Sequence, residues 1–86
     1  MKRSKTIHNS SYSNLIEKLC LERKRLGLSQ TEVASFLQMT QSEVSKIETL
    51  ERRIDVLEFK ELLTVYRISE NLKLKQLVID FLDMES

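Results

Sequence analysis

The stretch LSQTEVASFLQMTQSEVSKIE, Leu28 to Glu48, contains the starts of two helices only a few residues apart. Ser29 and Thr40 are each followed three positions later by a glutamate, which is the pattern of a capping box. An apolar residue stands directly before each cap and another at the fourth helical position, the pair typical of a hydrophobic staple. The sequence therefore predicts helices over about Gln30–Leu37 and Gln41–Leu50, joined by a short link.

Similar signals predict a helix on either side of this pair. A third capping box, Asp55 to Glu58, predicts a helix over about Val56–Tyr66. Upstream, a helix is expected to begin between Ser10 and Asn14 and to end at Gly27, the only glycine in the chain. Its apolar residues follow the helical period: Tyr12, Leu15, Ile16 and Leu19.

A fifth helix is predicted after Ile68, with Ser69 as its cap. Its apolar stripe has helical spacing and consists of Leu74, Leu77, Val78, Phe81 and Leu82. The stripe is joined by three more apolar residues, so it is wider than a four-helix core requires. A symmetric dimer could cover the rest, and we expect these five residues to form its seam. The alternative is that this helix only completes the monomer's own core.

Composition agrees with an all-α fold. The chain has 86 residues, no proline, 41% hydrophobic and 31% charged residues, which favours one compact bundle of about five helices. No apolar run approaches the roughly 20 residues of a membrane span, and the basic, polar start lacks the apolar centre of a secretory signal. With a single cysteine, Cys20, the sequence suggests a cytoplasmic protein.

Charge is distributed unevenly although the net charge is only +1. Residues 1–53 contain ten Lys or Arg against six Glu, whereas residues 54–86 contain four against seven acids. A basic first part and an acidic second part are compatible with one end meeting an anionic partner. Chance segregation of surface charge would produce the same pattern.

Two short helices joined by a tight link are typical of a helix-turn-helix, whose second helix enters the major groove of DNA. Here the polar side of that helix carries Gln41, Ser42, Ser45, Lys46 and Thr49. Glutamine can pair with adenine, lysine can donate to guanine, and serine can donate or accept. These residue types therefore suit the reading of base edges.

The chain resembles the Cro and phage-repressor type of helix-turn-helix, also called the XRE family, over about Leu15–Ile68. The resemblance rests on RLGLSQTEVA, then MTQSEVSKIE, then ERRIDVLEF, in this order. It implies a bundle of about five helices that binds double-stranded operator DNA as a homodimer to control transcription. From this resemblance together with the predicted helix bounds, we expect a basic N-terminal arm over residues 1–10, a DNA-binding domain over 11–68 and a C-terminal helix over 69–86 that completes the core, forms a dimer contact, or both.

The resemblance assigns roles to individual residues. Gln41, Ser42 and Lys46 would read bases, and Gln30, Arg52 and Arg53 would contact the DNA backbone. Beyond the resemblance, we expect Ser45 to read a base and Thr40 and Thr49 to contact the backbone. Gln30 would also brace Gln41. Arg23 and Glu48 would form a structural ion pair, which explains an acidic residue late in the recognition helix.

The sequence departs from the family at two positions where glycine is usual, Gln38 and Leu50. If the backbone is left-handed there, each residue costs on the order of 1 kcal/mol. Alternatively, the recognition helix continues past Leu50, which would place Arg52 and Arg53 differently.

No pattern in the sequence indicates an enzyme, a metal site or a cofactor. Cys20 lies among apolar neighbours without a base beside it, and His8 is the only histidine. We therefore expect a sequence-specific regulator of transcription, a dimeric repressor at a palindromic operator. Alternatives are an antitoxin or a restriction-modification controller with a protein partner bound through the C-terminal helix, or an interaction module that has lost DNA binding.

Overall fold

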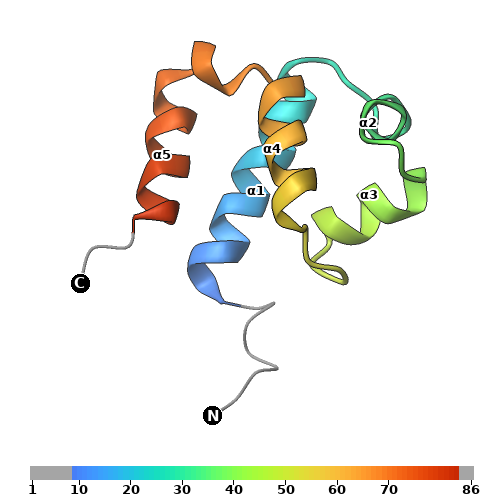
Figure 1. Cartoon of the computed structure of the whole chain (residues 1–86), viewed down its shortest axis with the longest axis horizontal. Coiled ribbons are helices and arrows are strands. Elements are labelled where there is room, and N and C mark those ends of the chain that lie inside the picture. The colour runs from blue at the N-terminus through green and yellow to red at the C-terminus, as the bar shows by residue number, and fades with distance from the viewer. Residues whose placement is uncertain (1–8, 84–86) are drawn as a thin grey trace.

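A computed structural model describes residues 9–83, which form five α-helices, one 3-10 helix and no strand. The elements are α1 (Ser10–Arg25), α2 (Gln30–Leu37), α3 (Gln41–Glu48), α4 (Val56–Val65), η2 (Ile68–Glu70) and α5 (Leu72–Leu82). In Figure 1, α1 and α4 occupy the middle, α2 and α3 lie on one side, and α5 lies on the other. The predicted all-α bundle of about five helices is confirmed.

All three capping boxes form. The hydroxyl of Ser29 accepts a hydrogen bond from the backbone N–H of Glu32 (3.0 Å), and the Glu32 carboxylate accepts one from the N–H of Ser29 (2.8 Å). The same reciprocal bonds occur at the boxes that begin with Thr40 and Asp55. These local bonds satisfy N–H groups that lack partners within the helix, which is why the three starts are where the sequence predicts them.

Two helix ends and one cap differ from the predictions. Helix α3 ends at Glu48 and helix α4 at Val65, earlier than expected. The cap of α5 is Asn71, whose side-chain oxygen accepts from the N–H of Leu74 (3.1 Å), so the prediction of Ser69 was wrong. Ser69 lies inside η2, because the chain makes this extra turn before α5 begins.

Left-handed backbone ends α2 and turns the chain after α3. Gln38 has φ +58° and Leu50 has φ +67°, so the recognition helix does not continue past Leu50. Arg67, with φ +54°, is a third left-handed residue that the sequence did not reveal, and Gly27 adopts φ +75° after α1. The turn at Gln38 lets the N–H of Met39 bond to a carbonyl of α2, which closes the helix end.

Replacing Gln38 by glycine is expected to stabilise the protein by about 1 kcal/mol, because glycine has no Cβ to oppose left-handed backbone. Gln38 is exposed, so little packing is lost. Denaturant unfolding monitored by circular dichroism measures the change. Gln38→Ala is the matched control, since alanine keeps the Cβ and should bring no comparable gain. Equal stability of the two variants would contradict this explanation.

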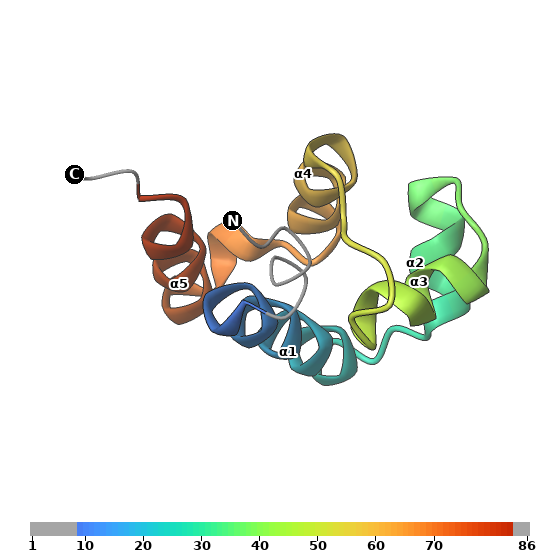
Figure 2. The same cartoon turned by 90° about the horizontal axis from the view of Figure 1, so that it is seen from below.

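One hydrophobic core joins the helices. Its buried side chains are Leu15, Ile16, Leu19, Val33, Ala34, Leu37, Val44, Ile47, Leu62, Tyr66, Ile68, Leu74 and Val78. Helix α1 packs against both α3 and α5, while α2 packs against α3 and α4. Figure 2 shows α1 between α5 and the α2–α3 pair. The first helix therefore connects the helix-turn-helix to the C-terminal helix.

The stripe of α5 lies largely in this core. Leu74 and Val78 are buried at 6% and 5% exposure, and Leu77 and Phe81 are half-buried against the core, so only Leu82 is exposed. The predicted dimer seam included all five residues of the stripe. Leu74 and Val78 instead lie in the monomer's own core, because α5 packs on α1 within the same chain.

Two further expectations concern the ends and the membrane. The predicted basic arm lies mostly outside the described residues, since α1 begins at Ser10 with Asn9 as its cap. Across residues 9–83, no helix has the length and apolar character needed to cross a bilayer.

Candidate nucleic-acid interface

Helix α3 presents a polar face to solvent and an apolar face to the core. Val44 and Ile47 are buried, whereas Gln41, Ser42 and Lys46 are exposed. Ser45, the fourth predicted base-reading residue, is half-buried. The face therefore offers an amide, a hydroxyl and an ammonium group over about one and a half helical turns.

Behind this face lies an ion pair between α1 and the end of α3. Arg23 donates from Nε to one oxygen of Glu48 (2.7 Å) and from Nη2 to the other (3.0 Å). The two side chains are only 10% and 11% exposed. Arg23 also donates from Nη1 to the backbone carbonyl of Leu28 (2.7 Å), which ties α1 to the segment before α2. The structure thus brings together the two residues expected to pair.

The ion pair extends toward the exposed face through two glutamines. Gln30, at the start of α2, donates from its amide nitrogen to Glu48 (2.8 Å). Gln41, at the start of α3, donates in turn to the amide oxygen of Gln30 (2.6 Å). A continuous line of polar contacts therefore connects α1, the two motif helices and a residue on the exposed face of α3.

Cys20 also belongs to this line, which sequence reasoning missed. Its thiol donates to Glu48 (3.4 Å), and burial, followed by the nearby Glu48 charge, raises the pKa of Cys20. The signal available in the sequence was its position three residues before Arg23, which places both side chains on the same face of α1. Cys20 is therefore a weak donor within the site and is disfavoured as a thiolate.

Burial and hydrogen bonding act on Glu48 in opposite directions. Burial raises the pKa of Glu48, but the hydrogen bonds from Arg23 and Gln30 outweigh it and keep the pKa below the ordinary value of 4.5. The same contact raises the pKa of Arg23. Both groups are thus held in their charged forms at neutral pH.

A lowered pKa predicts how stability responds to acid. The stabilisation from Glu48 is fully present above about pH 4.5, its unfolded value, and is lost as the pH falls through the lower folded value. Denaturant unfolding between pH 7 and 3 should therefore show a smaller acid loss for Glu48→Gln than for wild type. Some loss should remain in the variant, because Glu22 and Glu58 also have lowered pKa values. If the free energy of unfolding fell by the same amount in both proteins over this pH range, the stabilising role of the Glu48 carboxylate would be contradicted.

The residues predicted to contact the DNA backbone differ in their exposure and in the contacts that their side chains already make. Thr40 and Thr49 are exposed, as is Arg53, and Gln30 is half-buried in the polar line. Arg52 forms a bidentate ion pair with Glu58 of α4, with N–O distances of 2.9 and 2.8 Å. Glu58 thus serves both the capping box and Arg52, a double role that the sequence did not reveal.

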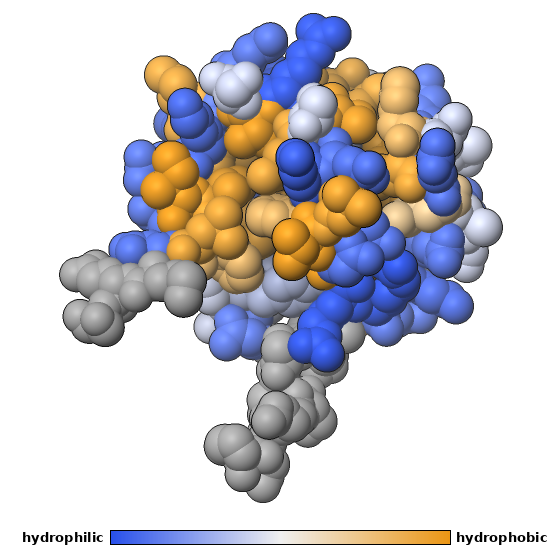
Figure 3. Space-filling view, viewed as in Figure 1, coloured by the Kyte–Doolittle hydropathy of each residue, from blue (hydrophilic) through white to orange (hydrophobic). Residues whose placement is uncertain are grey.

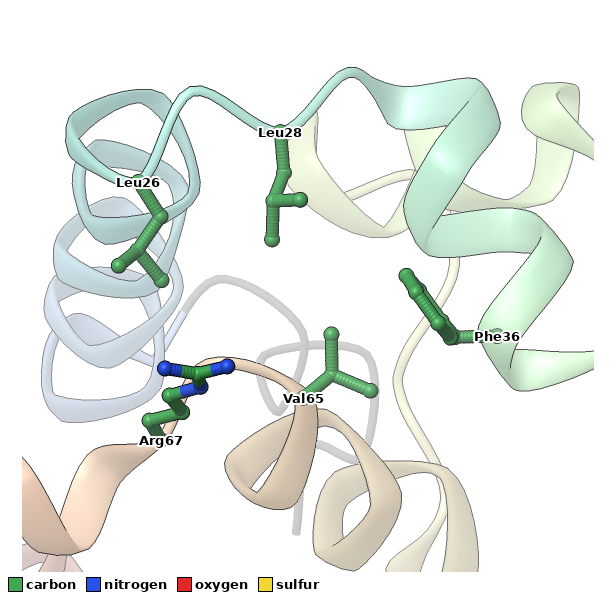
Figure 4. Close-up of a pocket in the computed structure, with 5 residues that line it drawn as sticks. All are labelled: Leu26, Leu28, Phe36, Val65 and Arg67. Atoms are coloured by element: carbon green, nitrogen blue, oxygen red, sulfur yellow. The ribbon is translucent and has the colours of Figure 1, made fainter.

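The protein also has a hollow away from this face. A cavity of about 440 Å³ lies between the end of α1, helix α2 and the end of α4, and is lined by Leu26, Leu28, Phe36, Val65 and Arg67. Figure 4 shows the four apolar side chains and the Arg67 guanidinium directed toward its centre. It contains no nucleophile beside a base. Within residues 9–83, no group of three or more His, Cys, Asp or Glu could hold a metal ion.

Comparison with known proteins identifies the family. The helix-turn-helix family HTH_3 matches residues 21–73, more than half of the chain and all of α2, α3 and α4. No match to a curated protein was found. The matched segment contains the exposed face of α3 and most of the polar line behind it. The chain belongs to the Cro and phage-repressor type, or XRE family, of helix-turn-helix DNA-binding regulators.

Proposed function

We propose that the protein is a sequence-specific repressor that binds a palindromic operator as a homodimer, in the cytoplasm. The observation that carries this proposal is the exposed polar face of α3. Its first residue, Gln41, donates to Gln30, and Gln30 donates to Glu48 of the buried Arg23–Glu48 pair. A recognition helix must present its first residues to base edges in a defined geometry. Side chains already ordered before binding lose less conformational entropy on contact with DNA.

The roles of the exposed residues follow from their chemistry. Gln41, Ser42, Ser45 and Lys46 read bases, with Ser45 limited by its partial burial. Gln30, Thr40, Thr49 and Arg53 contact the phosphate backbone. Arg52 contributes less than Arg53, because its guanidinium is already engaged by Glu58.

Exposed apolar side chains at one side of the molecule support a dimer. Val56 and Leu57 at the start of α4 are 86% and 63% exposed, and Ile79 and Leu82 of α5 are 49% and 54% exposed. The space-filling view shows apolar residues gathered over α5 and the neighbouring part of α4 (Figure 3). Two copies joined here would carry two recognition helices, as a palindromic site requires.

Leu82→Asp is expected to convert the dimer to monomers, because it places a charge within the proposed contact. Sedimentation velocity over a concentration series measures the change. Leu82 is preferable to Phe81, which is half-buried with its ring 6.5 Å from that of Tyr12. The control is Phe36→Asp, an exposed apolar residue on α2 outside the proposed contact, which should leave the dimer intact. Dimers of Leu82→Asp at wild-type affinity would exclude this surface.

The function itself is tested by selecting duplexes from a random DNA library near physiological salt and sequencing those retained. An enriched palindrome with half-sites about one helical turn apart supports the proposal. Retention only at low salt, without any enriched sequence, indicates nonspecific electrostatic binding and contradicts it.

A protein partner is a second candidate function, as for an antitoxin or a restriction-modification controller. Phe36 is 61% exposed at the edge of the cavity in Figure 4, which shares no residue with the proposed dimer surface. This candidate would be favoured if a second small protein copurified with the wild type but not with the Phe36→Asp variant. An interaction module without DNA binding is the outcome if no duplex is retained.

A further inference from the structure

The cavity beside α2 combines an apolar wall with a single charge. It lies between the end of α1, helix α2 and the end of α4, and has a volume of about 440 Å³. Its apolar wall consists of Leu26, Leu28, Phe36 and Val65, and among the described residues that line it only Arg67 is charged. Small-molecule pockets typically measure about 300 to 1,000 Å³ and have mostly apolar walls with a few polar groups. The cavity therefore has the size and the chemistry of such a pocket.

One side of the wall is held in place by the chain itself. Leu26 follows α1 and Leu28 lies before α2, with Gly27 in left-handed backbone between them, φ +75°. Figure 4 shows both leucine side chains directed toward the centre of the cavity. The Leu28 carbonyl accepts a hydrogen bond from Arg23 (2.7 Å), which ties this segment to α1. A ligand would therefore meet a preformed surface, and this lowers the entropic cost of binding.

Phe36 provides apolar area that the rest of the chain does not cover. The side chain is 61% exposed, although Val33, Ala34 and Leu37 of the same helix are buried in the core. An apolar ligand over the Phe36 ring would remove this surface from water. An aromatic ligand could also stack on the ring.

Arg67 has a conformation and a direction that contacts within the chain do not explain. Its backbone is left-handed, φ +54°, and its N–H donates to the Thr64 carbonyl (3.1 Å) at the end of α4. Glycine or asparagine would end a helix in this way more easily than arginine. Within residues 9–83 the guanidinium forms no hydrogen bond or ion pair, yet it is directed into the cavity (Figure 4). A guanidinium without a partner beside an apolar wall is suited to receive a carboxylate through two parallel hydrogen bonds.

We propose that this cavity binds a small carboxylate with an apolar body. The carboxylate pairs with Arg67, and the apolar body packs against Phe36 and the aliphatic side chains of the wall. The cavity by itself suits a small molecule better than a protein, because a stable protein interface takes about 20 to 30 residues on each side and five residues line this hollow. None of them belongs to the proposed DNA contacts or to the proposed dimer surface, so the proposal does not depend on DNA binding.

Three compounds that differ only in their head group test the role of the charge. Phenylpropionate, phenylpropanol and phenylpropylammonium are titrated separately into the wild-type protein, and the shifts of the backbone amides are followed by two-dimensional NMR. Phenylpropionate should shift the amides of the five lining residues most. It should bind roughly tenfold more tightly than phenylpropanol, the lower end of the range for hydrogen bonds to charged groups. Phenylpropylammonium should bind most weakly, because Arg67 repels it.

Matched variants separate the contact with Arg67 from net charge and from apolar binding. Arg67→Gln should weaken phenylpropionate roughly tenfold and leave phenylpropanol nearly unchanged, because it removes only the charged donor. Lys18→Gln is the control and should change neither affinity, since Lys18 is an exposed cation that lines a different hollow, between α1 and α5. Phe36→Ser should weaken both compounds by a similar factor, because it removes apolar contact area.

The proposal is supported if the shifts centre on the cavity and the preference for the carboxylate disappears in Arg67→Gln. Equal binding of the three compounds would overturn it, because the hollow would then be apolar without a role for Arg67. It is also overturned if no compound binds or if the shifts lie elsewhere in the protein, which would leave this surface to the protein partner considered above. The comparison of ligands uses the wild type and decides the matter even if a variant is unstable. Selection of DNA duplexes is a separate measurement, so either result can fail while the other stands.

Discussion

Arg23→Met is expected to lower the free energy of unfolding by about 3 to 5 kcal/mol, the typical effect of removing one partner from a buried ion pair. The variant removes the cation from Glu48, whose side chain is only 11% exposed in the wild type, and it also removes the donor to the Leu28 carbonyl. Denaturant unfolding at pH 7 provides the measurement. Because domains of this size are only marginally stable, partial unfolding at room temperature is an expected result.

Controls separate loss of the pair from loss of a charge. Lys24→Met removes a neighbouring exposed cation of α1 and should change stability little. Arg23→Met combined with Glu48→Met should recover much of the loss, because two apolar side chains leave no buried charge unpaired. A small effect of Arg23→Met alone would show that water readily reaches Glu48 and that the pair does not hold α3 in place.

Lys46→Ala is expected to reduce discrimination at particular base positions by about 1 to 3 kcal/mol, because it removes a donor to guanine acceptors. Lys46 is exposed on α3, one helical turn beyond Ser42. Binding to the selected operator and to each of its single-base variants gives the discrimination position by position. An unchanged profile at every position would exclude Lys46 from base reading.

Arg53→Ala is the matched comparison. A phosphate contact carries no sequence information, so this variant should weaken all duplexes alike and lower the slope of log affinity against log salt by about 1. Arg52→Ala should behave differently, because Arg52 is bound to Glu58. Its loss should affect stability as well as affinity. Wild-type salt dependence in Arg53→Ala would contradict the phosphate assignment.

The stability of this protein and its proposed reading of bases depend on neighbouring side chains. Arg23 and Glu48 hold α1 to the end of α3, and the Glu48 carboxylate also accepts a hydrogen bond from Gln30, which in turn accepts one from Gln41, the first residue of α3. A variant of Arg23 or Glu48 is therefore expected to change both stability and DNA affinity, so the folded fraction must be measured before an affinity is interpreted.

Local patterns account for what could be predicted. The three capping boxes, and with them the start of every helix from α2 to α4, follow from bonds between residues three positions apart. Such bonds depend only on neighbouring residues, so they can be read from the sequence. The exposed and buried faces of α3 follow from helical periodicity in the same way.

Elements without a local signal were predicted less well. Ser69 and Asn71 are both acceptable caps, and the extra turn of η2 decided between them. The end of α3 depended on whether Leu50 would adopt left-handed backbone, a choice that the sequence left open. The capping preference of Ser69 and the preference of Leu50 for right-handed backbone are each too weak to overcome the packing of the surrounding helices.

The sequence by itself determined an all-α helix-turn-helix of the XRE type and the residues on the outward face of α3, because capping and periodicity are local. Only the tertiary structure decided which faces remain free. It placed Leu74 and Val78 in the core, paired Arg52 with Glu58, and joined Cys20 to Glu48 across 28 positions of the chain. Contacts between residues distant in sequence depend on how the helices pack, and no local pattern encodes that arrangement.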